Sequence, residues 1–287
     1  MGSTALRVVA TGPSVLVQDL GRLGLAHLGV PRAGALDAPA AALARRLVGG
    51  APDDAVLEVL LGGLEVVLEA DTGSGAWVAV TGAPCPVAVD GRAAPLGRAV
   101  WVPAGSRLVL GRPATGLRSY LAVDGGLPVA EVLGSRSSDT LAGIGPAPVR
   151  VGDRLPVGVR RGEPGRVEVP PARAAGPLRL HPGPRGEWCE DPLAALTART
   201  WSVGADSDRV GLRLHGEPLV RRRTEELASE GLVLGAVQVP PDGLPVVFLA
   251  DHPPTGGYPV VAVVEEADLW RCAQLRPGEQ VGFTRAR

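Results

Sequence analysis

The residues best able to do chemistry lie in glycine-rich loops that follow short apolar segments. Near the N-terminus, Asp19 and Arg22 stand in the segment 18–22, QDLGR. A guanidinium presents parallel N–H groups to two oxygens, so this pair could hold an anion or a polarised carbonyl. The same letters also fit a turn capped by the aspartate, with Asp37 capping a following helix. Both interpretations are open at this point.

A second polar group is the loop 134–140, GSRSSDT, which follows the apolar segment that begins at Arg118. Ser135 and Arg136 open this loop. Three hydroxyls, one glycine and one arginine within six residues let it present several donors to a phosphate or a carboxylate. The alternative is a solvated loop that binds nothing.

Arginine recurs beside turns in the second half of the chain. Arg185 follows the turn letters HPGP, and Asp208 stands directly before Arg209. Together with Arg213, these arginines are candidate clamps for an anion. A single arginine on a strand commonly faces water, so surface ion pairs are the alternative interpretation.

The loop 251–258, DHPPTGGY, completes the candidates. Asp251 and Tyr258 bracket it, Thr255 lies inside it, and Gln238 ends the apolar segment before it. The single histidine in this loop is a weak candidate for a general base, and the other histidines show no metal-ligand spacing. We therefore expect no metal site. Without a Gly-x-Ser-x-Gly turn, the chemistry predicted is positioning and charge stabilisation rather than covalent catalysis.

The composition excludes several classes of function. All 29 basic residues are arginine, so neither a Schiff base nor a covalently attached biotin can form on a lysine of this sequence. The formal charge is −1, which argues against nucleic acid as a partner. The three cysteines have no CxxC spacing, and no apolar run is long enough to span a bilayer. We expect a cytoplasmic protein with no membrane partner.

The elements that must position these residues are mostly short strands. Glycine and proline number 40 and 28, which in an apolar sequence indicates many tight turns. One helix is predicted after Asp37, with Pro39 in its first turn and Gly49 and Gly50 at its end. Short helices are also expected at 191–198 and 267–275. The predicted strands are 6–10, 15–17, 64–68, 76–80, 99–102, 108–110, 120–123, 178–181, 200–203, 210–214, 232–239, 246–250, 260–264 and 280–284.

The length of 287 residues favours two domains. A segment rich in arginine, glycine and proline predicts a linker at 161–177, between domains at 6–160 and 178–287. Turn-and-strand hooks recur in both halves, near Pro103, Val151 and Pro277. This repetition suggests that each half is a closed barrel of similar design.

The motifs, taken in order, resemble one protein family. Its members are variously called allophanate hydrolase subunit 2, the C subunit of 5-oxoprolinase and biotin-dependent carboxyltransferase subdomain, and they include KipA-like antagonists of a sporulation-kinase inhibitor. Pro253 and Pro254 stand before Thr255 where many members have Gln-Thr. The segments that carry the resemblance are VQDLGR (17–22), GVPRAGALD (29–37), YLAVDGG (120–126), GSRS (134–137), GPR (183–185), SDRVGLRL (207–214), SEG (229–231), QVP (238–240), TGGYP (255–259), DL (268–269) and AQLRPG (273–278).

The resemblance implies a mainly β fold with two cyclophilin-like β-barrel lobes and a few short helices. It also implies membership of an ATP-dependent complex that opens 5-oxo-L-proline to L-glutamate, a lactam hydrolase active only with partners. Those partners would resemble the A subunit of 5-oxoprolinase and its KipI-like B subunit, and ATP would act with Mg shared among subunits. The alternatives are a carboxyltransferase subunit using carboxybiotin borne elsewhere, in urea or allophanate metabolism, or a regulatory binding protein.

A urea carboxylase would normally bring biotin carboxylase and carrier segments on the same chain, so the length favours the oxoprolinase interpretation. The residues expected to carry it, in a groove between the lobes or at a partner interface, are Arg118, Ser135, Arg136, Asp208, Arg209, Gln238 and Tyr258. The second choices for substrate binding are Asp19, Arg22, Arg185, Arg213, Asp251 and Thr255.

Overall fold

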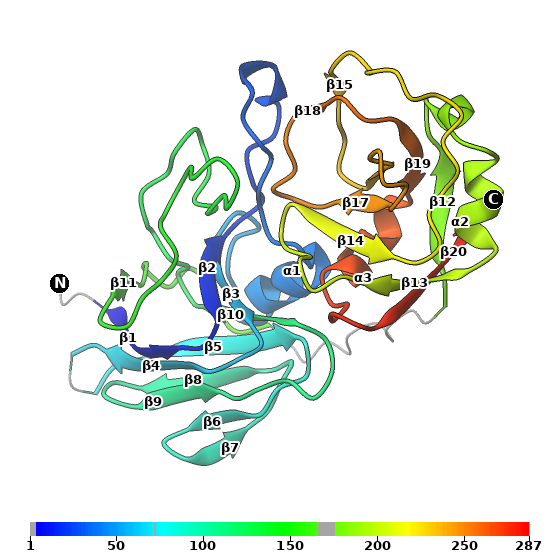
Figure 1. The fold of residues 1–287 in the computed structure, drawn as a ribbon. Helices are drawn as coiled ribbons and strands as arrows, with labels where there is room; N and C mark the ends of the chain where they lie inside the picture. Colours follow the sequence, from blue (N-terminus) through cyan, green and yellow to red (C-terminus); the bar gives the residue numbers. More distant parts are fainter. Residues whose placement is uncertain (1–3, 72, 166–175, 287) are drawn as a thin grey trace. The chain divides into compact units, whose positions relative to one another are not determined.

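The computed structural model describes residues 4–71, 73–165 and 176–286, and the chain divides into two compact units (Figure 1). Unit 1 consists of Met1–Arg22, Ala33–Asp139 and Gly143–Ala172. Unit 2 consists of Leu23–Arg32, Thr140–Ala142 and Arg173–Arg287. Unit 2 thus takes two short segments from the first half of the sequence. Residues 166–175, which make up most of the expected linker, lie outside the described residues.

Unit 1 contains two antiparallel sheets. One has the strand order β11-β1-β4-β9-β6-β7 and the other has the order β2-β3-β10-β5-β8. The strands are β1 (Ala5–Thr11), β2 (Ser14–Gln18), β3 (Val56–Leu60), β4 (Leu64–Glu69), β5 (Gly75–Gly82), β6 (Val87–Val89), β7 (Arg92–Ala94), β8 (Ala99–Pro103), β9 (Arg107–Leu110), β10 (Arg118–Val123) and β11 (Arg154–Pro156).

The chain changes sheet in unit 1 at corners built from glycine. Gly12, between β1 and β2, and Gly62, between β3 and β4, both have positive φ. A Cβ added to Gly12 would lie 2.0 Å from the Gly62 carbonyl oxygen, so the corners touch through bare backbone. Within the described residues no strand pairing joins the two sheets. Unit 1 therefore consists of two separate sheets that share one core. The repeated turn-and-strand hooks had suggested that the strands of this half would pair into a single closed barrel.

Both sheets bury side chains in that core, and a helix covers the far face of one of them. Strand β10 is buried along its whole length because its side chains alternate between two apolar layers. Leu121 and Val123 point into the core between the sheets, whereas Tyr120 and Ala122 pack with helix α1 (Ala38–Leu47). This packing fixes the position of the Tyr120 ring.

Helix α1 confirms the prediction from its capping residues. The Asp37 carboxylate accepts a hydrogen bond from the Ala40 backbone N–H at 3.0 Å, and a proline lies in the first turn. Its apolar side, with Ala41, Leu43 and Leu47, is buried against the five-stranded sheet. The local signals were sufficient here because the cap, the first turn and the apolar stripe agree.

Unit 2 is a closed barrel with the strand order β12-β19-β16-β17-β14-β13-β20. Strands β15 and β18 form a separate two-stranded sheet. In sequence, β15 comes directly before β16, and β18 comes directly before β19. The expectation of a mainly β chain with a few short helices is confirmed. The elements are β12 (Leu178–Pro182), β13 (Thr200–Val203), β14 (Gly211–His215), β15 (Glu230–Gly231), β16 (Ala236–Gln238), β17 (Val246–Phe248), β18 (Thr255–Gly256), β19 (Val260–Val264), β20 (Gln280–Arg285), η1 (Ala26–Leu28), η2 (Gly186–Trp188), α2 (Pro192–Thr197), η3 (Glu266–Asp268) and α3 (Leu269–Cys272).

Several predicted elements of unit 2 are shorter than expected, and two of them differ most. The strand predicted at 232–239 begins only at Ala236, because Gly235 adopts a turn with φ +85° and a Cβ there would meet the Leu269 side chain at 2.9 Å. The helix predicted at 267–275 is a 3-10 turn followed by α3, which ends at Cys272. Apolar runs alone did not show where the backbone turns.

The three cysteines are free thiols, and each is buried. Cys85 belongs to the core of unit 1, whereas Cys189 and Cys272 lie in unit 2. Burial raises the pKa of the Cys272 thiol to about 12. In the described part of the chain, no helix has the length and apolar character needed to cross a bilayer.

Candidate functional site

The Asp19 carboxylate is the centre of a buried cluster in unit 1. Its Oδ1 accepts hydrogen bonds from the hydroxyls of Ser135 and Ser137, each at 2.6 Å, and from the Gly21 N–H at 2.8 Å. Its Oδ2 accepts from the Arg136 N–H at 2.6 Å. Burial by itself would raise the pKa of Asp19, but these four donors lower it below its ordinary value. The carboxylate is therefore ionised at neutral pH.

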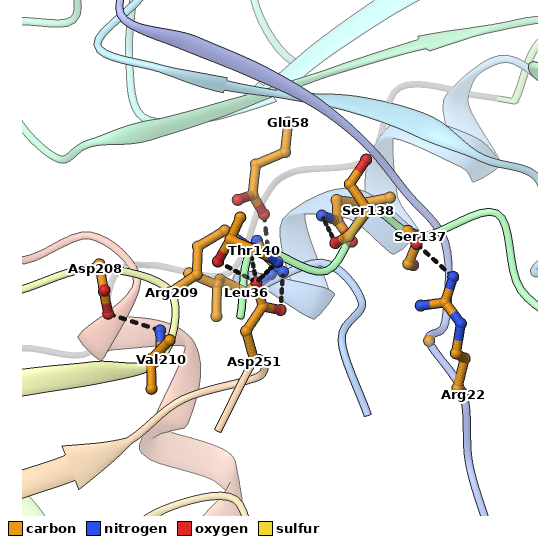
Figure 2. A network of polar contacts seen from close by, with 12 residues as sticks. Arg22, Leu36, Glu58, Ser137, Ser138, Thr140, Asp208, Arg209, Val210 and Asp251 are labelled. Carbon is orange, nitrogen blue, oxygen red and sulfur yellow. Dashed lines mark hydrogen bonds and ion pairs between the residues drawn. The ribbon is translucent and has the colours of Figure 1, made fainter. Parts of the chain in front are cut away.

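The two serines of the cluster also hold the backbone. The Ser137 hydroxyl accepts from the Asp19 N–H at 2.9 Å, and the Ser135 hydroxyl accepts from the Ser137 N–H at 3.0 Å. Arg22 donates from Nη2 to the Ser137 carbonyl at 2.6 Å and from Nε to the Val132 carbonyl at 3.0 Å. Figure 2 shows the Arg22 guanidinium turned toward Ser137. These contacts fix the loop after β10 to the end of β2.

Two atoms beside this cluster are buried without a hydrogen-bond partner among the described residues. They are Oε1 of Gln18 and the hydroxyl of Ser138. The amide of Gln18 is oriented, because its Nε2 donates to the Ser138 carbonyl at 2.9 Å. Leaving such groups unsatisfied costs roughly 1–3 kcal/mol each, so ordered water or a ligand commonly completes them. Together they offer one acceptor and one hydroxyl.

A separate buried network in unit 1 contains Arg118, which was predicted to be catalytic. The Arg118 guanidinium lies 3.4 Å from Oε1 of Glu58. Oε2 of Glu58 accepts from the Tyr120 hydroxyl at 2.8 Å and from the Leu36 N–H at 3.0 Å. Burial, followed by the negative charges of Glu58 and Asp37, raises the pKa of Tyr120 well above its ordinary value. This network ties β3 and β10 to the start of α1.

In unit 2, Arg209 and Asp251 form a bidentate ion pair. Nε and Nη2 of Arg209 each donate to one carboxylate oxygen at 2.9 Å, and both side chains are buried. Thr140 adds two bonds to Oδ2 of Asp251, from its N–H at 2.9 Å and from its hydroxyl at 2.7 Å. Figure 2 shows these three side chains converging. The pair was predicted from the sequence only as two separate candidates.

A second group in unit 2 surrounds β15 and β18. The Arg185 guanidinium is ion-paired with Glu230, and Glu230 and Gly231 pair with Gly256 and Thr255 across the two strands. A Cβ on Gly256 would lie 2.9 Å from Nε2 of Gln238, so bare backbone packs against that amide. Four of the predicted residues are thus gathered here: Arg185, Gln238, Thr255 and Tyr258.

Within this β15–β18 group, Tyr258 is exposed and can reach a ligand. Nε2 of Gln238 donates to the Tyr258 carbonyl at 2.9 Å, which fixes the backbone of the tyrosine. The Tyr258 side chain is 46% exposed. A phenol in this position can donate a hydrogen bond to a ligand while its backbone is held.

Two predicted residues of unit 2 serve local structure. Oδ1 of Asp208 accepts from the N–H groups of Val210 and Gly211 at 2.8 and 3.1 Å, which closes the turn before β14. Arg213 faces Asp206 at 3.4 Å, and both side chains are well exposed. Asp208 therefore stabilises a turn, and Arg213 forms a surface ion pair, which was the alternative interpretation of the arginines.

The environment of His252 favours the neutral form. Burial lowers the pKa of this imidazole, and the nearby charge of Arg32 adds to that effect, against a hydrogen bond to the Pro253 carbonyl and the charge of Asp251. Nδ1 lies 2.8 Å from that carbonyl. The ring is therefore anchored and uncharged at neutral pH.

The sequence missed several residues that complete these networks. Glu58 and Thr140 were not candidates, yet each contacts a residue that was. Gln18 was not a candidate either, although it stands next to Asp19 and holds the Ser138 carbonyl. Glu58 belongs to a strand that was not predicted, where a glutamate normally faces water. In the described part of the chain, no cluster of three or more histidine, cysteine or carboxylate side chains could hold a metal ion.

Comparisons with known proteins agree on one family. The sequence matches the family described as carboxyltransferase domain, subdomain A and B, over residues 28–285. It is 39% identical over 283 residues to the 5-oxoprolinase C subunit of Escherichia coli (strain K12), and the match covers 97% of this chain and 90% of that protein. The Haemophilus influenzae protein of the same name is 33% identical over 277 residues, covering 93% of this chain and 86% of its own length.

A solved structure shows the same fold. The crystal structure of the Kluyveromyces lactis urea carboxylase superposes on this chain with a TM-score of 0.89 at 27% sequence identity. The match covers 100% of this chain but 28% of that one, so this chain corresponds to one part of a much longer enzyme.

Proposed function

Because the chain belongs to the carboxyltransferase domain, subdomain A and B, family, we propose that it is one member of an ATP-dependent 5-oxoprolinase complex. The complex would open 5-oxo-L-proline to L-glutamate together with proteins that resemble the A and B subunits of 5-oxoprolinase. The observation that carries the proposal is the 39% identity to the E. coli C subunit, which extends over 97% of this chain.

The chemistry explains why such a complex needs ATP. A lactam is a poor electrophile, because its nitrogen donates electron density to the carbonyl. Transfer of the ATP γ-phosphoryl group to the lactam oxygen would activate the carbonyl carbon. One water would then add to that carbon and the ring nitrogen would depart as the amine, leaving an acyl phosphate. A second water would hydrolyse the acyl phosphate to phosphate and the new carboxylate. Preorganised N–H and O–H donors stabilise the charge that develops on the oxygen.

On this chain, the β15–β18 group of unit 2 supplies the donors best able to reach a substrate. Tyr258 has an exposed phenol, and Gln238 holds its backbone. Arg185 carries positive charge at the same place, although Glu230 partly neutralises it. We assign Tyr258 to substrate contact and Gln238 to positioning. The buried Arg209–Asp251 pair then supports the fold of unit 2, and the Arg118–Glu58 pair supports the fold of unit 1.

The residues also bear on how ATP and Mg would be held. Mg²⁺ is commonly bound through one or two carboxylates and the phosphates of the nucleotide, so a three-ligand protein cluster is not required. The sequence has no lysine for a P-loop, and its cationic donors are all arginine. Arginine binds phosphate by a bidentate geometry, and this fits a nucleotide site shared with partner subunits.

The deciding experiment reconstitutes this chain with its genomic-neighbour subunits. Phosphate release from ATP and glutamate formation are measured together, with and without 5-oxoproline. The proposal predicts that both products appear in a fixed ratio and only with 5-oxoproline. An assembled complex that shows neither product would contradict it.

The assignment of Tyr258 is tested in the same complex. Tyr258→Phe removes one exposed hydroxyl, so turnover should fall while the thermal midpoint stays unchanged. Arg213→Gln is the matched surface variant, since the Arg213 side chain is exposed and ion-paired with exposed Asp206, and it should keep wild-type turnover. Equal turnover of wild type and Tyr258→Phe would remove Tyr258 from the site.

The likeness to the urea carboxylase structure supports a second candidate function, carboxyl transfer. The carboxyl group would come from carboxybiotin borne on another protein, because this sequence has no lysine to attach biotin. A carboxybiotin-dependent assay with urea as acceptor separates the two functions. Carboxylated product without 5-oxoproline turnover would favour this alternative.

A further inference from the structure

Three consecutive arginines, Arg221 to Arg223, lie in the connection between β14 and β15 of unit 2 (Figure 1). The backbone of this segment is pinned to the end of η2. The Arg222 N–H donates to the Trp188 carbonyl at 2.8 Å, and Cys189 pairs with Arg221 in an isolated β-bridge. The three side chains therefore start from a fixed backbone, although two of them are exposed.

The first and third arginines converge on one aromatic ring. The guanidinium carbon of Arg221 lies 5.9 Å from the centroid of the Trp188 ring, and that of Arg223 lies 5.7 Å from it. Arg222 lies between them at a bend of the backbone, and the ring contacts of Trp188 are made by the residues on either side of it. Trp188 is 4% exposed, so this packing covers its indole.

These arginines differ from most of the others in the same unit. The side chains of Arg221, Arg222 and Arg223 have no carboxylate partner among the described residues, and Nε of Arg221 is buried with no hydrogen-bond acceptor there. A buried guanidinium N–H without an acceptor is costly. The arginines of unit 2 that do have a carboxylate partner are Arg179, Arg185, Arg199, Arg209, Arg213, Arg271 and Arg285.

Two cations that share one ring repel each other unless an anion lies between them. A phosphate group has several oxygens and can accept from both guanidinium forks at once. We propose that Arg221 and Arg223, packed on Trp188, form a binding site for a phosphate or polyphosphate group, such as inorganic pyrophosphate or the phosphate tail of a nucleotide. The site stands independently of the 5-oxoprolinase proposal, because its geometry lies wholly in this chain.

Calorimetric titration of the full chain with pyrophosphate tests the site. We expect saturable binding that weakens as salt is raised. Arg221→Gln and Arg223→Gln should each raise the Kd about tenfold, because each removes a charge-assisted contact. Arg222→Gln removes the same charge from the same segment but leaves both arginines that pack on Trp188, and should change the Kd less than about twofold. Absence of saturable binding, or an equal effect of Arg222→Gln, would overturn the proposal.

Tryptophan fluorescence provides a readout at the site itself. Pyrophosphate should change the emission of the wild-type chain, and Trp188→Phe should abolish most of that change while keeping a ring beneath the arginines. If Trp188→Phe fails to fold, the Arg223→Gln chain replaces it, because Arg223 is exposed, and the emission change should again be lost. An unchanged emission response in the variant used would place binding elsewhere.

Further titrations identify the source of the phosphate. Tighter binding of ATP than of pyrophosphate, lost in Arg223→Gln, would support the site as one for a nucleotide. Equal affinities for the two would support it as one for free polyphosphate. A peptide of glutamates that binds as tightly as pyrophosphate, with the same response to the variants, would show a site for acidic protein segments and overturn the phosphate assignment.

Discussion

Two buried carboxylates, Asp19 in unit 1 and Asp251 in unit 2, have the same number of bonds but different partners. Each accepts four hydrogen bonds, three on one oxygen and one on the other. The donors to Asp19 are hydroxyls and backbone N–H groups, all neutral. Two of the four donors to Asp251 belong to the guanidinium of Arg209. The negative charge of Asp251 is thus balanced by a guanidinium that binds it directly, whereas the four groups that donate to Asp19 are uncharged.

This difference decides what removal of each carboxylate leaves behind. Without Asp251, the buried guanidinium of Arg209 loses the carboxylate to which its Nε and Nη2 both donate. Without Asp19, only neutral donors are left, and hydroxyls can rotate toward other acceptors. The number and geometry of a carboxylate's hydrogen bonds thus do not by themselves predict how much stability is lost when it is removed. The charge of the donors must be counted as well.

The largest effect is expected for Asp251→Ala. It breaks a buried ion pair and should lower the free energy of unfolding by about 3–5 kcal/mol, measured by urea denaturation. The double variant Arg209→Leu with Asp251→Leu removes both charges and should be more stable than the single variant. A single variant as stable as the wild type would show that the pair contributes nothing.

Asp19→Asn should have a smaller effect, a loss of about 1.5–3 kcal/mol, because charge-assisted hydrogen bonds weaken while the groups that donate directly to the side chain are all neutral. The pKa of Asp19 is lowered in the folded state, so the unfolded chain binds the proton first as pH falls. The advantage of wild type over Asp19→Asn should therefore be full above about pH 4 and shrink below it. An advantage that persists at about pH 2 would contradict this assignment.

His252 gives the second unit a pH response at higher pH. Its pKa is lowered in the folded state, so below about pH 6.5 the unfolded chain takes up a proton that the folded chain refuses. The urea concentration at the unfolding midpoint should therefore decrease as the pH is lowered from about 7.5 to about 5.5. His252→Gln should make this decrease smaller. If the slope is the same in both proteins, another group is responsible.

The smallest effect is expected for Ser138→Ala, whose hydroxyl has no partner among the described residues. Its thermal midpoint should match the wild type or exceed it slightly, because an unsatisfied buried group is removed. Ser137→Ala is the matched control, since that hydroxyl both donates to and accepts from Asp19, and it should cost about 1–2 kcal/mol. Similar midpoints for the two variants would mean that Ser138 has a partner in solution.

The sequence predicted elements whose signals are local. Helix α1 followed from Asp37 and the proline after it, and strands such as β10 and β19 followed from continuous apolar runs. Strand β3 was missed because Glu58 interrupts its apolar pattern. The short β6 and β7 were missed because three residues carry too little pattern to distinguish a strand from a loop.

The site was predictable as a set of residues but not as a set of partners. Asp19 was a candidate, yet its serine donors stand 116 and 118 residues away in sequence. Thr140 and Asp251 are separated by 111 residues. Contacts of this kind depend on the order of the strands in the sheets, which cannot be inferred from a short stretch of sequence. Arg118 was predicted to be catalytic, and nothing in its own segment indicated that it would pair with Glu58.

Because the three thiols are buried, their rate of chemical labelling measures how often the surrounding structure opens. In the native state a thiol-specific reagent should meet no reactive cysteine, because burial raises the pKa of all three. Labelling then proceeds only as fast as each region opens. Since Cys85 lies in one unit and the other two in the second, the mass of the labelled peptides would time the opening of each unit separately, without any introduced probe.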